Sequence, residues 1–206
     1  MAWTTPTTTI VGDVISPTYW NTNARDNLNF LYNNSWVKIQ EIIVSSQNNI
    51  VFSSLGSLSF NHLMIIGALR SSLAATTDLI YLQFNGVGGT SYSFSFIQWK
   101  GDASLTNGSL LNSASFDPAY ICGGTAPTSS FSPVYILIPD YSSSSINKVI
   151  TSVVGTKINT SATTDLLYFQ NTGYFQNTAA ITSIKIGTNS ASNFVAGSYL
   201  DLYGLP

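Results

Sequence analysis

Apolar residues recur at every second position from Trp36 onward, and this period constrains the fold more than any other feature of the sequence. In the stretch YSFSFIQ, which begins at Tyr92, aromatic side chains alternate with serines. Period two places alternate side chains on opposite faces of a β-strand. The strand candidates found in this way are residues 37–44, 62–70, 79–84, 92–98, 134–138, 147–154, 166–170, 181–186 and 198–204.

Turn-forming residues separate these runs and complete the prediction of the fold. They are Asn85-Gly86, Asn107-Gly108, Asp117-Pro118, Gly123-Gly124, Pro139-Asp140 and Ser142–Ser145. About eight to ten strands in roughly 170 residues are typical of two packed antiparallel sheets. We therefore predict an all-β fold, a jelly-roll-like antiparallel β-sandwich over residues 36–206.

Residues 1–35 differ from the rest, and we predict that they form an extended arm with one short helix. The start is rich in threonine and should be extended. Ser16 is a good N-cap and Pro17 suits the first helical position, so a helix is expected over about 17–32. Its apolar stripe would consist of Trp20, Ala24, Leu28 and Leu31.

The arm carries large aromatic side chains that it is too short to bury by itself. Trp3 and Trp20 are two of the four tryptophans of the chain. An exposed aromatic of this size needs a surface to lie on, either on the same chain or on a partner. We predict docking to a partner through Trp3, Trp20, Arg25, Leu28 and Leu31.

One short sequence occurs twice, as ATTDLIYLQ from Ala75 and as ATTDLLYFQ from Ala162. Both copies contain Thr-Thr-Asp before an apolar run, and an Asp side chain can accept backbone hydrogen bonds in a turn. We interpret Asp78 and Asp165 as structural turn residues at the start of two similar strands. The alternative, which stays open, is that they are paired ligands or catalytic carboxylates.

The composition argues against several classes of function. Charged residues make up 8% of the chain, about a third of the usual share, and no cluster of Lys or Arg could bind nucleic acid. The single cysteine, Cys122, excludes a disulfide within the chain. We see neither a signal peptide nor an apolar run of the roughly 20 residues that a membrane helix needs, so we expect synthesis in the cytoplasm without membrane insertion.

Residues for catalysis or metal binding are sparse, and we predict neither an enzyme nor a cofactor or metal site. His62 is the only histidine, and neither it nor Cys122 has a partner for nucleophilic catalysis or a zinc site in the sequence. A glycosidase needs only two carboxylates and stays a weak alternative. Aromatics outside clear core positions could instead stack on sugar rings, and these are Trp99, Tyr120, Tyr141 and Tyr174.

The segment VGDVISPTYWNTNARDNLNFLY, which begins at Val11, resembles the N-terminal stretch of many tailed-bacteriophage virion proteins. The closing NFVAGSYLDLYGLP is similar to the last strand of phage sandwich domains. The matching positions at the start are Gly12, Asp13, Trp20, Asn21, Arg25, Asp26, Asn27, Leu28, Phe30 and Leu31.

This resemblance implies a structural component of the virion, assembled in the host cytoplasm. Such proteins include capsid decorations, head fibres and tail-associated parts. We expect a capsid decoration (cement) protein that docks through its arm to the major capsid protein or another virion protein, as a homo-oligomer and preferably a trimer. The alternative is a tail-fibre or receptor-binding module that recognises host-surface polysaccharide.

Overall fold

The computed structural model of the chain describes residues 5, 16–33, 35–101, 104–159 and 165–206. Trp3 and the other arm residues expected to be extended, apart from residue 5, lie outside this part. Helical residues comprise α1 (Pro17–Trp20), a π-helical turn (Asn21–Arg25) and α2 (Asp26–Asn33). The strands are β1 (Val37–Ile43), β2 (Ser46–Gln47), β3 (Asn49–Phe52), β4 (His62–Leu69), β5 (Thr77–Phe84), β6 (Tyr92–Lys100), β7 (Leu105–Ser113), β8 (Phe116–Cys122), β9 (Ser132–Ile138), β10 (Lys148–Lys157), β11 (Leu166–Phe175), β12 (Ile184–Thr188), β13 (Phe194–Val195) and β14 (Tyr199–Leu205).

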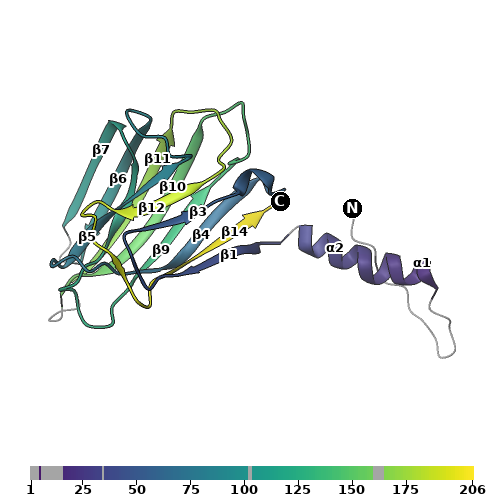
Figure 1. Ribbon diagram of the computed structural model, residues 1–206, viewed down its shortest axis with the longest axis horizontal. Helices are drawn as coiled ribbons and strands as arrows, with labels where there is room; N and C mark the ends of the chain where they lie inside the picture. Colours follow the sequence, from purple (N-terminus) through teal and green to yellow (C-terminus); the bar gives the residue numbers. More distant parts are fainter. Residues whose placement is uncertain (1–4, 6–15, 34, 102–103, 160–164) are drawn as a thin grey trace.

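Two antiparallel sheets form the body of the protein, as the alternating sequence predicts (Figure 1). Within the described residues, one sheet has eight strands in the order β1-β14-β4-β9-β10-β11-β6-β7, and the other has four in the order β3-β12-β5-β8. A small ribbon pairs β2 with β13. The all-β antiparallel sandwich is thus confirmed, with more strands than the eight to ten expected, while the jelly-roll assignment stays a prediction.

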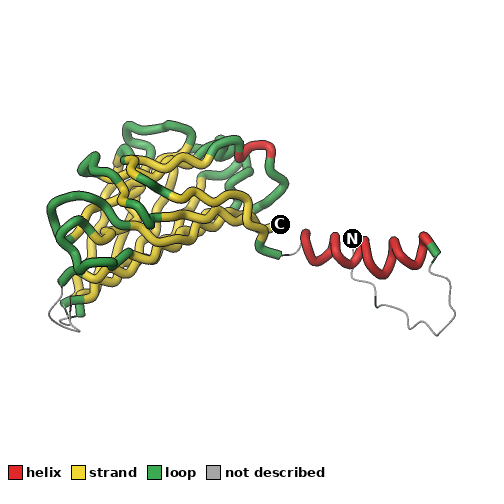
Figure 2. Tube along the Cα trace, turned by 60° about the horizontal axis from the view of Figure 1, so that its bottom comes forward, coloured by secondary structure: helices red, strands yellow, loops and turns green. Residues whose placement is uncertain are grey.

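Figure 2 shows the strands of the two sheets as two layers, and the buried core residues come from both, as follows from the alternation. Along β11, Leu167 and Phe169 are buried, whereas Leu166 and Tyr168 on the opposite face are exposed. The strand β5 alternates in the same way. Each sheet therefore contributes one apolar face to a shared interior, which is the arrangement that stabilises a sandwich.

An aromatic cluster joins the two sheets inside this core. Phe84 of β5 packs edge-on against Phe175 of β11, with ring centroids 5.3 Å apart. Tyr92 of β6 stacks on Phe175 at 4.8 Å, and its hydroxyl accepts a hydrogen bond from the backbone N–H of Phe84 at 2.7 Å. A buried phenol needs such a partner, so this contact fixes β5 against β6 and β11.

Two predicted turns are wrong, because both lie inside strands. Asn107-Gly108 is in the middle of β7, and Asp117-Pro118 is in β8. Both strands lie at sheet edges, where a proline without a backbone N–H is tolerated. Glycine is needed at position 108, since a Cβ there would come within 2.8 Å of the Phe96 ring. Local composition indicates a turn at these positions, but packing against the neighbouring strand determines that they are extended.

Candidate docking surfaces and binding cleft

The helical segment begins where the sequence predicts a helix. The Ser16 hydroxyl accepts a hydrogen bond from the backbone N–H of Tyr19 at 3.1 Å, and Pro17 follows in the first turn. In Figures 1 and 2 the helix extends from the β1 end of the sandwich and lies over neither sheet. Its π-helical turn, from Asn21 to Arg25, is a feature that often occurs at functional sites.

The apolar side chains expected to dock are exposed on this helix. Trp20 is 60% exposed, Leu28 65% and Leu31 49%. Arg25 pairs with its neighbour Asp26, with Nε and Oδ1 2.9 Å apart, but this contact is on the surface and contributes little to stability. The helix therefore presents apolar surface that the described sandwich does not cover.

A second exposed apolar surface covers the outward side of β10, β11, β6 and β7, which we call the outer apolar face. The pairing register places Gly155, Tyr168 and Trp99 in one row across three strands, followed by Leu105 on β7. A hollow of about 340 Å³ lies beside this row. The exposed members of the face are Ile97, Trp99, Leu105, Leu111, Val149, Leu166, Tyr168 and Tyr174.

This face is nearly free of charge. Within the described strands, its outward positions hold Ser, Thr, Asn and Gln besides the apolar residues, and the one charged side chain is Lys157 at the end of β10. The apolar side chains gather in the row of Tyr168 and Trp99 and around Ile97, and a row of Thr and Ser side chains separates them from Val149 and Tyr174. Large exposed apolar patches often mark contact sites for other macromolecules.

Charged side chains gather at the other edge of the same sheet, where Lys38 contacts two carboxylates. Lys38 Nζ lies 2.7 Å from Glu41 Oε2 and 3.0 Å from Asp201 Oδ1. The hydrogen bond to Glu41, and then the ion pair with Asp201, raise the pKa of Lys38. This cluster ties β1 to β14, at the edge of the sheet away from the outer apolar face.

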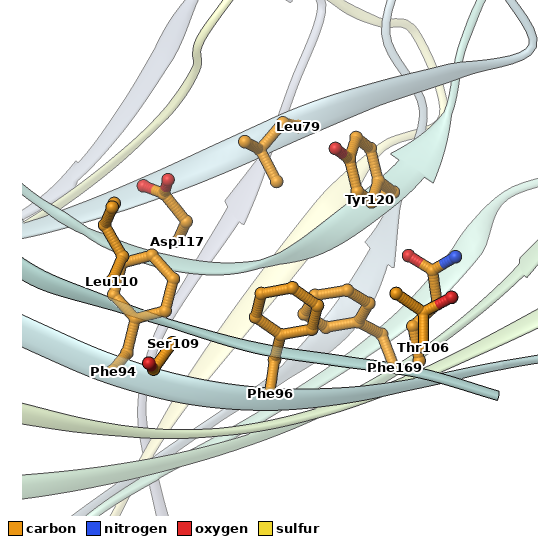
Figure 3. A pocket seen from close by; sticks show the side chains of 10 residues that line it. Leu79, Phe94, Phe96, Thr106, Ser109, Leu110, Asp117, Tyr120 and Phe169 are labelled. Carbon is orange, nitrogen blue, oxygen red and sulfur yellow. The ribbon is translucent and has the colours of Figure 1, made fainter.

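A cleft opens between β8, the edge strand of the smaller sheet, and the strands β6 and β7 of the larger sheet (Figure 3). Its volume is about 410 Å³. Phe96 and Phe169 stack with centroids 5.1 Å apart, and Tyr120 meets Phe169 edge-on at 6.0 Å. The full lining is Leu79, Phe94, Phe96, Gln98, Thr106, Ser109, Leu110, Asp117, Tyr120 and Phe169.

Asp117 supplies the one carboxyl group among the described residues of this lining. Its Oδ1 accepts a hydrogen bond from the Ser115 hydroxyl at 2.9 Å, and Asn189 provides a further side-chain hydrogen bond. Burial raises the pKa of Asp117, while these two hydrogen bonds lower it. The sequence pattern missed this residue because Asp before Pro indicates a turn. Its place opposite Phe94 and Phe96 depends on how β8 lies over the larger sheet.

The two repeated segments form strands in different sheets. Asp78 is the second residue of β5 in the smaller sheet, whereas Asp165 directly precedes β11 in the larger one. Asp78 therefore does not lie in a turn as predicted, because Thr77 and Asp78 already pair with β8. Its buried carboxylate accepts a hydrogen bond from Ser190 Oγ at 2.7 Å. Tyr81 and Tyr168 both point away from the core. The two copies of the repeat therefore direct equivalent side chains outward, one from each sheet.

Other residues considered in the sequence analysis make contacts that stabilise the fold. His62 begins β4, and its Nδ1 accepts a hydrogen bond from the Asp140 backbone N–H. Cys122 is buried beside Ser132. Tyr141, expected to be outside the core, is fully buried and donates to the Leu55 carbonyl. Trp99 and Tyr174 are exposed, as expected.

Comparison with known proteins adds no assignment. No protein-family model matches the chain, and no curated protein matches it. Among the described residues there is no group of three or more His, Cys, Asp or Glu side chains that could hold a metal ion. In the same part of the chain, no helix has the length and hydrophobicity to cross a membrane.

Proposed function

We propose that this protein is a non-enzymatic structural component of a tailed-phage virion, most specifically a capsid decoration protein that docks through its N-terminal arm. In this proposal the helix and the residues before it hold a neighbouring virion protein, such as the major capsid protein. The sandwich forms the body that projects from the particle.

The observation that carries the proposal is the exposed apolar surface of the helix. Trp20, Leu28 and Leu31 are each about half exposed or more, on an element that covers neither sheet. Burying one such side chain contributes about 1.5–3 kcal/mol, so the three together can supply several kcal/mol before the cost of association. A helix laid into an apolar groove is a common mode of recognition.

The outer apolar face supports the second part of the proposal, which is assembly into a homo-oligomer, preferably a trimer. Among its described residues, the outer apolar face carries one charged side chain, Lys157, and this lies at its margin. Two copies of the face can therefore pack together with little like-charge repulsion. Most soluble oligomers are symmetric assemblies of identical chains. Several copies in one assembly would also bind the particle through several arms at once, and multivalency raises the overall affinity.

The cleft supports the non-enzymatic part of the proposal. Hydrolysis of a glycosidic bond uses a pair of carboxyl groups on the two sides of that bond. Among the residues that the structure describes, Asp117 is the only carboxyl residue that lines the cleft. The arrangement is therefore better suited to binding than to hydrolysis.

The experiment is a loading assay on phage particles assembled without this protein. Purified full-length protein is added, the particles are sedimented, and the bound copies are counted. We expect the triple variant Trp20→Ala, Leu28→Ala, Leu31→Ala to lose most of its binding. Because alanine is the best helix former, the helix itself should persist.

The matched control is Val51→Ala, which removes an exposed apolar side chain from β3 in the smaller sheet. This variant should load like the unmodified protein. Trp3→Ala and Arg25→Ala test the two remaining docking residues in the same assay. Full loading of the triple variant would contradict arm docking, whatever the state of the sandwich.

A further inference from the structure

We propose that the cleft between β8 and the β6–β7 strands binds a neutral glycan chain, with one sugar ring lying on the aromatic surface of Phe96 and Tyr120 and hydrogen-bonding Asp117. This activity goes beyond a docking role, and it depends on neither the arm nor the outer apolar face.

The size and shape of the cleft suit a small organic ligand. Its volume of about 410 Å³ falls within the range of roughly 300–1,000 Å³ that is common for ligand sites. Figure 3 shows the side chains of Leu79 and Tyr120 facing Phe96 and Phe169 across it. Such sites are mostly apolar with a few placed polar groups, which is the composition here.

The aromatic rings form a surface that is already ordered before a ligand arrives. Phe96 and Phe169 stack with an interplanar angle of 16°, and Tyr120 meets Phe169 at 82°. Phe169 is 4% exposed, so its position is set by the core. A rigid surface loses little conformational entropy on binding, and the C–H face of a pyranose ring can lie flat against it.

The polar groups of the cleft match a polyhydroxylated ligand. The Asp117 carboxyl group can accept hydrogen bonds from neighbouring hydroxyls, while Gln98 and Thr106 can each donate and accept. Figure 3 shows Asp117 and Thr106 in the same cleft as the aromatic rings, and Gln98 belongs to the same lining. A sugar has this same combination of an apolar ring face and hydroxyls around its edge.

The lining disfavours two other ligand classes. Among the described residues no Lys or Arg lines this cleft, although Lys100 lines a neighbouring hollow, and Asp117 would repel a phosphate or a carboxylate. A quaternary ammonium ion would need several open ring faces around it. Here Phe96 and Phe169 cover one face of each other, so the rings do not form a box.

The cleft also continues into a second hollow, which favours a chain over a single sugar. That hollow has a volume of about 330 Å³ and shares Gln98 and Tyr120 with the first. Its other walls include Thr76, Thr77 and Lys100, so it is more polar. Together they form a groove with an aromatic part and a hydroxyl-rich part, suited to consecutive rings of an oligosaccharide.

The experiment is an array of short neutral oligosaccharides of glucose, galactose, mannose and N-acetylglucosamine, probed with the full-length protein. Each array hit is then titrated by calorimetry. We expect at least one specific hit. Asp117→Asn and Phe96→Ala should each weaken its binding about tenfold or more, which corresponds to about 1.4 kcal/mol or more.

Controls separate loss of the site from loss of the fold. Tyr199→Ala removes an exposed aromatic from β14, far along the larger sheet from β6, and should leave binding unchanged. Gln98→Ala changes a polar group without altering the ring stack, and should also weaken binding. Each variant is first compared with the unmodified protein by thermal unfolding, so that only folded variants are interpreted.

Three results would overturn the inference. The first is an array without a specific hit, and the second is binding that persists in folded Asp117→Asn and Phe96→Ala variants. The third is saturable binding of choline, used as the probe cation, that depends on Asp117 while sugars do not bind. None of these bears on loading to particles, so the docking proposal would stand or fall separately.

Discussion

The side-chain hydroxyl of Thr156, on β10 of the larger sheet, donates a hydrogen bond of 2.6 Å to the backbone carbonyl of Tyr120, on β8 of the smaller sheet. Two further contacts repeat this relationship, from Ser152 Oγ to the Pro118 carbonyl and from Asn171 Nδ2 to the Asp117 carbonyl. The backbone carbonyls on the free edge of β8 thus accept hydrogen bonds from side chains of the opposite sheet, where an inner strand would have a neighbouring strand. Covering an edge in this way protects it from pairing with other chains, and it also sets one wall of the cleft.

Thr156→Val should destabilise the protein by about 1–3 kcal/mol, because it leaves the partly buried Tyr120 carbonyl without the Thr156 donor. The Ser132 hydroxyl, 2.8 Å from Thr156 Oγ1, would lose a partner as well. Urea unfolding measures the change. Thr151→Val, at an outward position of the same strand, is the control and should change stability by less than about 0.5 kcal/mol. Equal effects of the two variants would contradict this role of Thr156.

Gly173→Ala should destabilise the protein by about 1–3 kcal/mol or more, because a Cβ at this position would lie 2.3 Å from the ring of Phe116. Thermal unfolding of the two single variants and of the double variant with Phe116→Leu tests this contact. The double variant should lose less than the sum of the single losses, since leucine leaves room for the new methyl group. Gly155→Ala is the control, because its Cβ would meet only Pro133 at 3.7 Å.

Tyr92→Phe should destabilise the protein near neutral pH by about 1–3 kcal/mol, because the buried N–H of Phe84 loses its acceptor. It should also change the response to alkali. Burial, partly offset by the hydrogen bond from Phe84, raises the pKa of Tyr92 to about 12. Between about pH 10, where the unfolded phenol ionises, and about pH 12, the folded state holds the proton more tightly.

Stability of the unmodified protein should therefore fall as the pH rises through this window. In Tyr92→Phe the fall should be shallower but still present, because burial also raises the pKa of Tyr141. Urea unfolding at about pH 9 and about pH 11 measures both slopes. Parallel slopes would show that Tyr92 does not contribute. Tyr199→Phe, on the surface of β14, is the control for the loss of a tyrosine hydroxyl.

The outer apolar face should mediate self-association. We expect the unmodified protein to be an oligomer, preferably a trimer, and the double variant Trp99→Ser, Tyr168→Ser to dissociate because it removes two neighbouring exposed rings. Analytical ultracentrifugation over a range of concentrations measures the distribution. Val51→Ser, on the smaller sheet, should leave the oligomer intact. A monomer at every concentration of the unmodified protein would contradict this prediction.

Local patterns predicted several elements well. Ser16 and Pro17 indicate the start of the helix, since a cap depends on residues within one turn. The alternation from Tyr92 correctly places Phe94 inside and Ser95 outside, because the period of a strand is itself local. Tyr141 was wrongly expected outside the core, since its burial depends on the distant Leu55 and Leu58.

The cleft is the clearest example of a feature that local sequence patterns do not predict. Asp117 and Phe96 are far apart along the chain, and they meet only because β8 lies against the larger sheet next to β6 and β7. No spacing in the sequence encodes that contact. The outer apolar face is similar, because the row of Tyr168 and Trp99 depends on the register between β11 and β6.

By itself, the sequence determined the class of the fold, the position of the helix and the apolar face of strands with a clear alternation such as β6, because these properties follow from the backbone period and from neighbours within a few residues. Only the tertiary structure decided which strands lie at the edges, which side chains complete them and where Asp117 meets the aromatic rings. Those outcomes depend on pairings between distant segments, and their free energies are set by packing rather than by local preference.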